Sequence, residues 1–146
     1  PVSVSYEWEP CGLLKAREMC LRQQGPYAKQ PGEDTQSIIS GITDFKGRVH
    51  FSICKPIEHD ELVAAYGSFD LIADLIDHRI SQGYHAWPNN KIAQEMLRSG
   101  SALAPSEDYL RFSYYLDQAC TQMPLGDSFR STLLGIYANS CPKATL

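Results

Sequence analysis

The chain has 146 residues, 43% of them hydrophobic and 21% charged, which is the composition of one globular domain with a real core. Its 13 basic and 17 acidic residues give a net charge of −4, and this balance offers no support for nucleic-acid binding, which needs a basic face. No apolar run approaches the roughly 18 residues that a membrane-spanning helix requires.

The opening stretch PVSVSYEWEP is predicted to be a strand. Val2, Val4, Tyr6 and Trp8 alternate with polar residues, which is the period of a strand with one buried face. A second strand is predicted at RVHFSICKPI, where apolar and polar residues alternate again and Pro56 ends the pattern. Both strands are strongly apolar on one face, so we expect further strands as their natural partners.

The rest of the chain has helical periodicity, with apolar residues three or four positions apart. Gly67 is a point at which the longest helical region can divide, Pro88 suits a first helical position and Ser106 suits an N-cap. The helical patterns lie within residues 10–24, 33–45, 60–84, 85–100, 104–120 and 126–141.

These elements predict an α/β fold in a single unit, residues 1–146: a helix-rich C-terminal fragment with two strands that would complete a larger sheet. About forty residues with two helical patterns separate the strands, a length that suits a crossover within one sheet better than a hairpin. We expect residues 1–56 to be the end of an α/β core and residues 57–146 to be a helical C-terminal extension.

Five cysteines lie far apart along the chain, and none belongs to a C-x-x-C pair. Neither a zinc knuckle nor a dithiol redox motif is therefore indicated. We expect free, mostly buried thiols, which favours a reducing, cytoplasmic location. The five are Cys11, Cys20, Cys54, Cys120 and Cys141.

Two pairs of titratable side chains are candidates for chemistry. Asp74 and His78 share a helix face and could orient an imidazole, although such pairs are common on solvated helix surfaces. His50 and Cys54 lie on one strand face as a base and a nucleophile, with no third group to orient the base. No second histidine stands at ligand spacing beside His78 and no Gly-rich phosphate loop occurs, so no metal site is indicated.

The basic residues Lys46, Arg48 and Lys55 bracket the second predicted strand. They are interpreted either as cations that receive a phosphate at the end of the sheet or as exposed turn residues without a ligand. Aromatic residues gather at 84–87 and 109–115. We interpret these clusters as core packing, with contact to a membrane interface as the alternative.

Six segments together resemble one family and cover most of the chain: PVSVSYEWEP, LLKARE, QPGED, ISGITDFKGRVHFSICKPI, GYHAWPNNKIA and LLGIYANSCP. The resemblance is to the C-terminal half of bacterial glycerophospholipid acyltransferases, which acylate glycerol 3-phosphate or lysophosphatidate. Its most distinctive parts are KGRVHFSICKP and GYHAWPNN. Pro1 and Val2 look like the end of that family's fourth motif, a Pro- and Val-rich strand that closes the substrate-binding half.

The family's catalytic motifs all precede this strand, and the chain lacks them. Members carry a His-x-x-x-x-Asp motif, a Phe/Arg-containing glycerophosphate motif and a Glu-Gly-Thr motif, whereas no Glu-Gly-Thr occurs here. The residues five positions after the four histidines are Lys55, Ala64, Gly83 and Asn90. The resemblance therefore implies the C-terminal part of such an enzyme, inactive in isolation because its chemistry-bearing half lies upstream.

In the mechanism that the resemblance implies, a histidine polarised by aspartate deprotonates the substrate hydroxyl. That oxygen attacks the thioester of acyl-CoA or acyl-carrier protein, while arginines hold the phosphate. No metal or other cofactor is required. For this chain we expect no catalytic residue, no metal ligand and no nucleic-acid partner, and we expect substrate contacts at Pro1, Val2, Tyr6 and Arg48.

The expected partners are acyl-CoA or acyl-carrier protein and a lysophospholipid, bound through the upstream half. The expected location is the cytoplasm, with peripheral contact to the inner face of the cell membrane. A second copy of the chain is a further candidate partner, because an uncovered strand edge invites pairing. The alternatives are a non-catalytic lipid-binding or interaction module on the same scaffold and a cysteine hydrolase that uses Cys54 and His50.

Overall fold

The computed structural model describes residues 1–99 and 106–140, which form seven helices and two strands. Each element falls on the segment where periodicity predicts it, and the region after position 58 divides at Gly67 into two helices. In chain order the elements are β1 (Val2–Tyr6), α1 (Gly12–Gln24), α2 (Glu33–Thr43), β2 (Val49–Ile53), α3 (His59–Ala64), α4 (Phe69–Gly83), α5 (Pro88–Ser99), α6 (Glu107–Gln122) and α7 (Asp127–Asn139).

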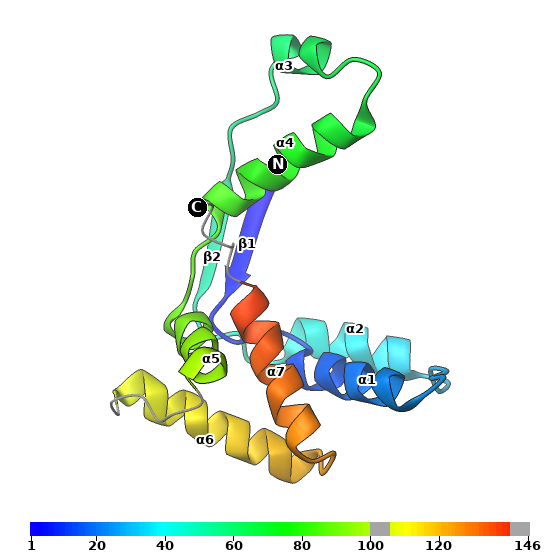
Figure 1. The fold of residues 1–146 in the computed structure, drawn as a ribbon, viewed down its shortest axis with the longest axis vertical. Coiled ribbons are helices and arrows are strands. Elements are labelled where there is room, and N and C mark those ends of the chain that lie inside the picture. Colours follow the sequence, from blue (N-terminus) through cyan, green and yellow to red (C-terminus); the bar gives the residue numbers. More distant parts are fainter. Residues whose placement is uncertain (100–105, 141–146) are drawn as a thin grey trace.

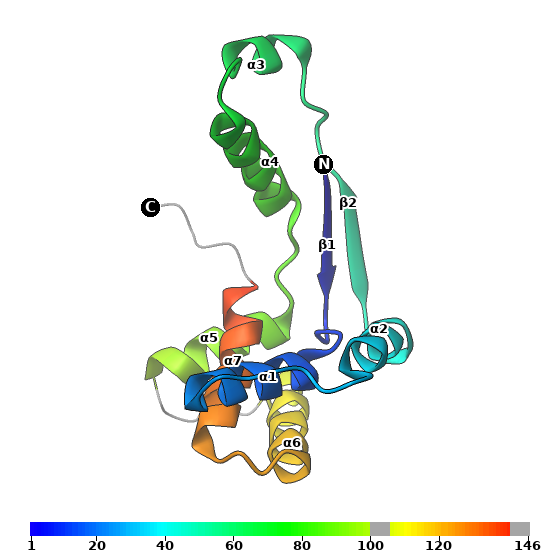
Figure 2. The ribbon, with the colours of Figure 1, turned by 90° about the vertical axis from the view of Figure 1, so that its right-hand side faces the viewer.

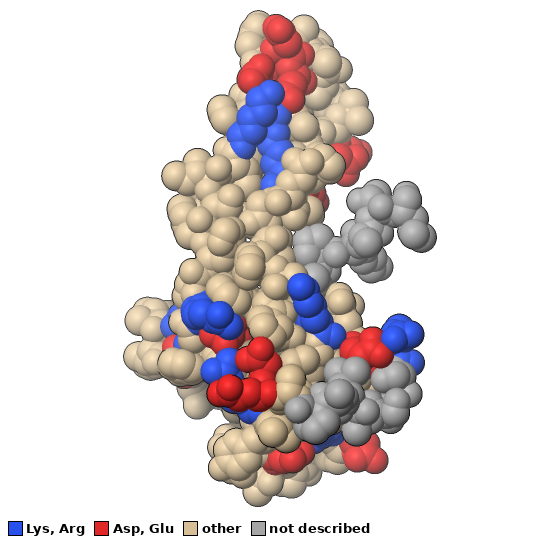
Figure 3. Space-filling model, turned by 90° about the vertical axis from the view of Figure 1, so that its left-hand side faces the viewer, with Lys and Arg blue, Asp and Glu red and all other residues tan. Residues whose placement is uncertain are grey.

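The molecule is elongated, with a helical body at one end and an arm, formed by α3 and α4, at the other (Figure 1). The body contains α1, α2, α5, α6 and α7, and the two-stranded sheet rises from it toward α3 and α4. In Figure 2, α4 lies on one side of the sheet, while no helix of the described chain covers the other side. Figure 3 shows that charged side chains gather on the arm and the body, with a wide uncharged area between them.

The core lies in the helical body, with α7 packed against α5 and α1. Phe129, Leu133 and Tyr137 are fully buried and stand four positions apart, so they form one face of α7. Phe112 and Leu116 of α6 are buried against them. Each such side chain contributes roughly 1.5–3 kcal/mol by leaving water.

The core also takes in residues from the first third of the chain. Ala16 and Cys20 of α1 are buried within the same cluster as α7. The segments before and after position 56 therefore share one core. The division of the chain into an α/β end and a helical extension stays a prediction.

The strands β1 and β2 pair antiparallel, with Val2 opposite Ile53 and Tyr6 opposite Val49. This pairing corrects the expectation of a crossover within one sheet, which is how parallel strands are connected. The physical reason is the position of α1 and α2. Both lie beyond one end of the sheet in the body rather than along a sheet face, so the chain reverses direction before β2 (Figure 1).

The polar face of the sheet is the covered one. Ser3 and Ser5 are each 1% exposed, and the end of α4 approaches so closely that a Cβ on Gly83 would lie 3.1 Å from the Ser3 Cβ. The opposite face is apolar and stays between 37% and 81% exposed. We call this the apolar sheet face. Its residues are Val2, Val4, Val49, Phe51 and Ile53.

The arm is fastened to the sheet by Arg79 of α4, which is only 6% exposed. Its guanidinium donates to the carbonyl oxygens of Lys55 and Pro56, at 3.1 and 2.5 Å, and to both carboxylate oxygens of Glu61, at 2.5 and 2.6 Å. One side chain therefore joins α4, α3 and the segment after β2. Among the described helices, none is both long and apolar enough to cross a bilayer.

Candidate functional site

The carboxylate of Glu7, directly after β1, joins three elements at the top of the helical body. Its side chain is 5% exposed and accepts hydrogen bonds from Arg48 Nε at 3.1 Å, Arg48 Nη2 at 3.3 Å and Arg111 Nη2 at 2.5 Å. Strand pairing brings Glu7 and Arg48 together, because the Glu7 backbone N–H donates to the Arg48 carbonyl. Arg111 arrives from α6.

The two arginines set the charge state of this carboxylate. Burial alone would raise the pKa of Glu7. Hydrogen bonds from Arg48 and the positive charges of Arg48 and Arg111 lower it by more, so the pKa of Glu7 lies below its ordinary value of 4.5. Each guanidinium also faces an aromatic ring: Arg48 lies 5.0 Å from the centre of Trp87 and Arg111 lies 5.7 Å from that of Trp8. Both cations are thus held in place.

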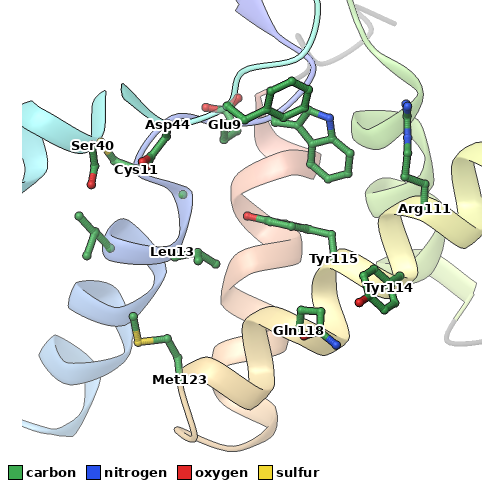
Figure 4. A pocket seen from close by; sticks show the side chains of 14 residues that line it. Glu9, Cys11, Leu13, Ser40, Asp44, Arg111, Tyr114, Tyr115, Gln118 and Met123 are labelled. Atoms are coloured by element: carbon green, nitrogen blue, oxygen red, sulfur yellow. The ribbon is translucent and has the colours of Figure 1, made fainter. Parts of the chain in front are cut away.

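A groove of about 770 Å³ opens between α1 and α6, next to Arg111 (Figure 4). Its walls are mainly apolar, with Leu13 from α1 and Tyr114 and Tyr115 from α6. Figure 4 shows Arg111 at one end of the groove and Met123 at the other. A cavity of this shape suits an apolar chain that ends near a positive charge.

An aromatic cluster supports the groove from behind. The ring of Trp8 lies 4.9 Å from that of Tyr115, which in turn lies 6.1 Å from Tyr137, and Phe112 lies 5.0 Å from Tyr137. Burial raises the pKa of both tyrosines, so they stay neutral. In the 109–115 segment, Phe112 and Tyr115 therefore pack as core residues, whereas Tyr114 is 67% exposed.

A second cavity, of about 470 Å³, lies beside Arg48. Arg48, His85 and Lys91 line it together with Trp87 and Asp108. We call it the basic cavity. A shallow cleft lies between this cavity and the apolar groove: it shares Arg48 and Asp108 with the first and Arg111 with the second, and Glu7 and Glu107 also line it.

The asparagines of GYHAWPNN hold the site together. Asn89 and Asn90 are fully buried; Asn89 Nδ2 donates to the Glu7 carbonyl at 2.7 Å, and Asn90 Nδ2 donates to the Tyr137 carbonyl at 3.0 Å. The Asn90 side-chain oxygen accepts from the Trp87 N–H at 2.8 Å. These bonds fix the start of α5 to the end of β1 and to α7.

The four residues expected to contact substrate do not come together. The Pro1 carbonyl accepts from the Cys54 N–H at one end of the sheet, while Arg48 lies beside Glu7 at the other end. Val2 belongs to the apolar sheet face, and Tyr6 is half-buried opposite Val49. Pro1 and Arg48 are therefore roughly 20 Å apart along the strand.

The three basic residues around β2 also separate. Lys46 donates to the carbonyls of Ile42 and Asp44 at the end of α2, and Lys55 pairs with Glu58 at the opposite end of the strand. A phosphate site built from Lys46, Arg48 and Lys55 is thus excluded. Arg48 is joined instead by His85 and Lys91.

The two candidate catalytic pairs find no supporting geometry. Asp74 and His78 are both exposed on α4. His50 and Cys54 are four strand positions apart, about 13 Å, which is too far for direct proton transfer. The imidazole of His50 instead lies 5.3 Å from that of His85. In the described part of the chain, no three His, Cys, Asp or Glu side chains gather as metal ligands.

Sequence reasoning missed Glu7, His85, Lys91 and Arg111 as site residues. Glu7 reads in the sequence only as a polar member of the alternating pattern, and Arg111 is 104 positions away from it. The antiparallel register is the signal that places Glu7 beside Arg48. Nothing local in α5 or α6 indicates that Lys91 lines a cavity with Arg48 or that Arg111 contacts Glu7.

Comparison of the chain with protein-family models, with curated proteins and with solved structures finds no match.

Proposed function

We propose that the chain is the C-terminal region of an acyltransferase of phospholipid biosynthesis. The enzyme moves an acyl chain from acyl-CoA or acyl-carrier protein to a hydroxyl of glycerophosphate or lysophosphatidate. The observation that carries the proposal is the apolar sheet face. Five apolar side chains of the two-stranded sheet stay uncovered, because α4 packs on the polar face alone, and an exposed apolar face of this kind marks an interaction surface.

In this proposal, strands outside the chain pair with β1 or β2 and complete a larger sheet. Elements of the upstream half that pack on the apolar sheet face cover Val4 and Phe51, whose full burial contributes roughly 1.5–3 kcal/mol each. The chain itself supplies support and substrate contacts rather than catalytic groups. None of its four histidines is followed by aspartate at the spacing that the resemblance requires.

The neighbouring cavities support the same proposal. An acyl chain with a phosphate at one end needs an apolar channel that leads to fixed positive charge. The apolar groove ends at Arg111, and the cleft beside it continues to Arg48. Peripheral contact with the cytoplasmic face of the membrane, where lysophospholipid resides, forms part of the proposal.

The test uses the intact open reading frame that contains this chain. Transfer of a labelled acyl group from acyl-CoA or acyl-carrier protein to glycerol 3-phosphate and to lysophosphatidate is measured. Phe51→Asp places a charge in the proposed buried sheet face and should lower transfer at least about tenfold. Leu110→Asp, on an exposed part of α6, is the matched control and should stay within about twofold.

Two results would contradict the proposal. A folded intact protein that transfers no acyl group to either acceptor would remove the activity. An upstream coding region without His-x-x-x-x-Asp would remove the catalytic half that the proposal requires.

A second candidate, a non-catalytic lipid-binding module, is favoured by the groove alone. It predicts that the isolated chain binds a fatty acid or lysophosphatidate, followed by the fluorescence of Trp8 at the groove wall. Leu13→Glu should weaken that binding. Binding by the isolated chain, combined with no transfer by the intact protein, would favour the module over the enzyme.

A further inference from the structure

The basic cavity brings together three nitrogen-bearing side chains from separate elements. Arg48 precedes β2, His85 lies between α4 and α5, and Lys91 lies in the first turn of α5. All three line one cavity of about 470 Å³, whose apolar wall includes Trp87. The geometry points to a binding site for a phosphate group.

Arg48 is already oriented for such a ligand. Glu7 accepts hydrogen bonds from its Nε and Nη2 atoms, and the guanidinium lies 5.0 Å from the centre of the Trp87 ring. The Nη1 group takes no part in these bonds and donates to no other residue in the described part of the chain, so it can donate to a ligand. A planar guanidinium fixed by two contacts loses little conformational freedom when it binds an oxyanion.

Lys91 and His85 supply the remaining donors. The Lys91 ammonium makes no ion pair with any described residue, so its charge is unmatched. The His85 ring rests edge-on against Trp87, with ring centres 4.3 Å apart, and lies beside His50. Imidazole donates to a phosphate oxygen in its neutral form and more strongly when protonated.

The balance of charge in the cavity is positive. Arg48 pairs with Glu7, and Asp108, the one carboxylate that lines the cavity, pairs with Arg111 at 3.4 Å. Arg48, Arg111 and Lys91 against Glu7 and Asp108 leave a net charge of +1, which Lys91 supplies.

The phosphate has two possible sources, free phosphate and a phospholipid headgroup, and the inference does not depend on acyl transfer. The chain is titrated with inorganic phosphate while the histidine imidazole signals are followed by NMR. In a second arm, co-sedimentation is measured with phosphatidylcholine vesicles that contain or lack phosphatidic acid. Binding in the first arm assigns free phosphate, and binding in the second arm alone assigns the headgroup.

Lys91→Gln is the decisive variant, because Lys91 is exposed and forms no ion pair within residues 1–99 and 106–140, so its loss should leave the fold intact. It should weaken binding about tenfold in whichever arm is positive. Lys15→Gln, on α1, removes the same charge elsewhere and should change affinity less than twofold. The His85 signal should shift with saturation, while that of His59 on the distant arm should not.

Two outcomes would overturn the inference. One is the absence of saturable binding to both inorganic phosphate and phosphatidic acid vesicles. The other is an equal loss of binding in Lys15→Gln and Lys91→Gln, which would mean that net charge rather than the cavity attracts the anion.

Discussion

Gly47 is the residue that allows Glu7 to meet Arg48. Its φ is 62°, and a Cβ there would lie 2.7 Å from both the Glu7 Oε2 atom and the Trp8 Cδ1 atom. Left-handed backbone costs a non-glycine residue about 1–3 kcal/mol, and the two collisions add to that cost. Gly47→Ala should therefore lower the free energy of unfolding by about 3 kcal/mol or more, measured in urea.

Gly67 provides a matched control for this substitution. It also has a positive φ, 84°, but a Cβ there would meet no atom within 4 Å. Gly67→Ala should cost only about 1 kcal/mol, the backbone part alone. Equal losses in the two variants would show that the contacts around Glu7 do not constrain position 47.

Glu7 also links stability to pH. Its folded pKa lies below the unfolded value of 4.5, so the stabilisation it gives is fully present above pH 4.5. As pH falls from 4.5 through the lower folded value, the unfolded chain takes up the proton first and this stabilisation is lost. In Glu7→Gln, the free energy of unfolding measured in urea should fall less steeply with decreasing pH over this range. An unchanged dependence of the free energy on pH would contradict the role of Glu7.

At the scale of elements, local periodicity is sufficient to predict which segments are helices and strands. Alternation at Val2–Tyr6 and spacing at Phe129, Leu133 and Tyr137 depend only on neighbours in the sequence. The direction of strand pairing depends instead on where α1 and α2 pack, which no local pattern specifies. For the same reason the burial of Ser3 and Ser5, against their polar character, could not be predicted.

The residues of the candidate site are harder to predict from the sequence than the strand pairing. Glu7, Arg48, Lys91 and Arg111 come from four different parts of the chain, and only tertiary packing brings them together. The sequence indicates Arg48 as a site residue because it flanks a strand. It does not indicate the residues that bind Arg48 and define its role.

The arm is held to the sheet mainly by the hydrogen bonds of one side chain, Arg79, and this can be tested by substitution. Arg79→Ala removes the hydrogen bonds to Lys55, Pro56 and Glu61 and should destabilise α3 and α4 by roughly 2–3 kcal/mol. Amide hydrogen exchange should quicken in the arm but not in α7. Arg22→Ala, which breaks an exposed pair with Glu18, is the control and should change neither the stability of the arm nor its amide exchange. Slow exchange in the arm of Arg79→Ala would contradict this account.

For the whole molecule, the apolar sheet face predicts self-association of the isolated chain. An uncovered face beside free strand edges favours pairing between copies. Light scattering should give a mass above that of one chain at high concentration, and Phe51→Lys should restore the monomer. A strict monomer at all concentrations would count against an interface on this face.

The central claim is that strands outside this chain complete its sheet. In an antiparallel pair, backbone N–H groups point alternately toward and away from the partner strand. The Cys54 N–H donates to Pro1 and the Glu7 N–H donates to Arg48, and this fixes which positions point inward. The N–H groups that point away from the partner strand are therefore those of Val2, Val4 and Tyr6 in β1 and of Val49, Phe51 and Ile53 in β2.

Amide hydrogen exchange at these six positions, compared between the isolated chain and the intact protein, tests that claim most directly. We expect fast exchange in the isolated chain and strong protection of at least one of the two sets in the intact protein. Equally fast exchange of both sets in the two proteins would contradict a completed sheet.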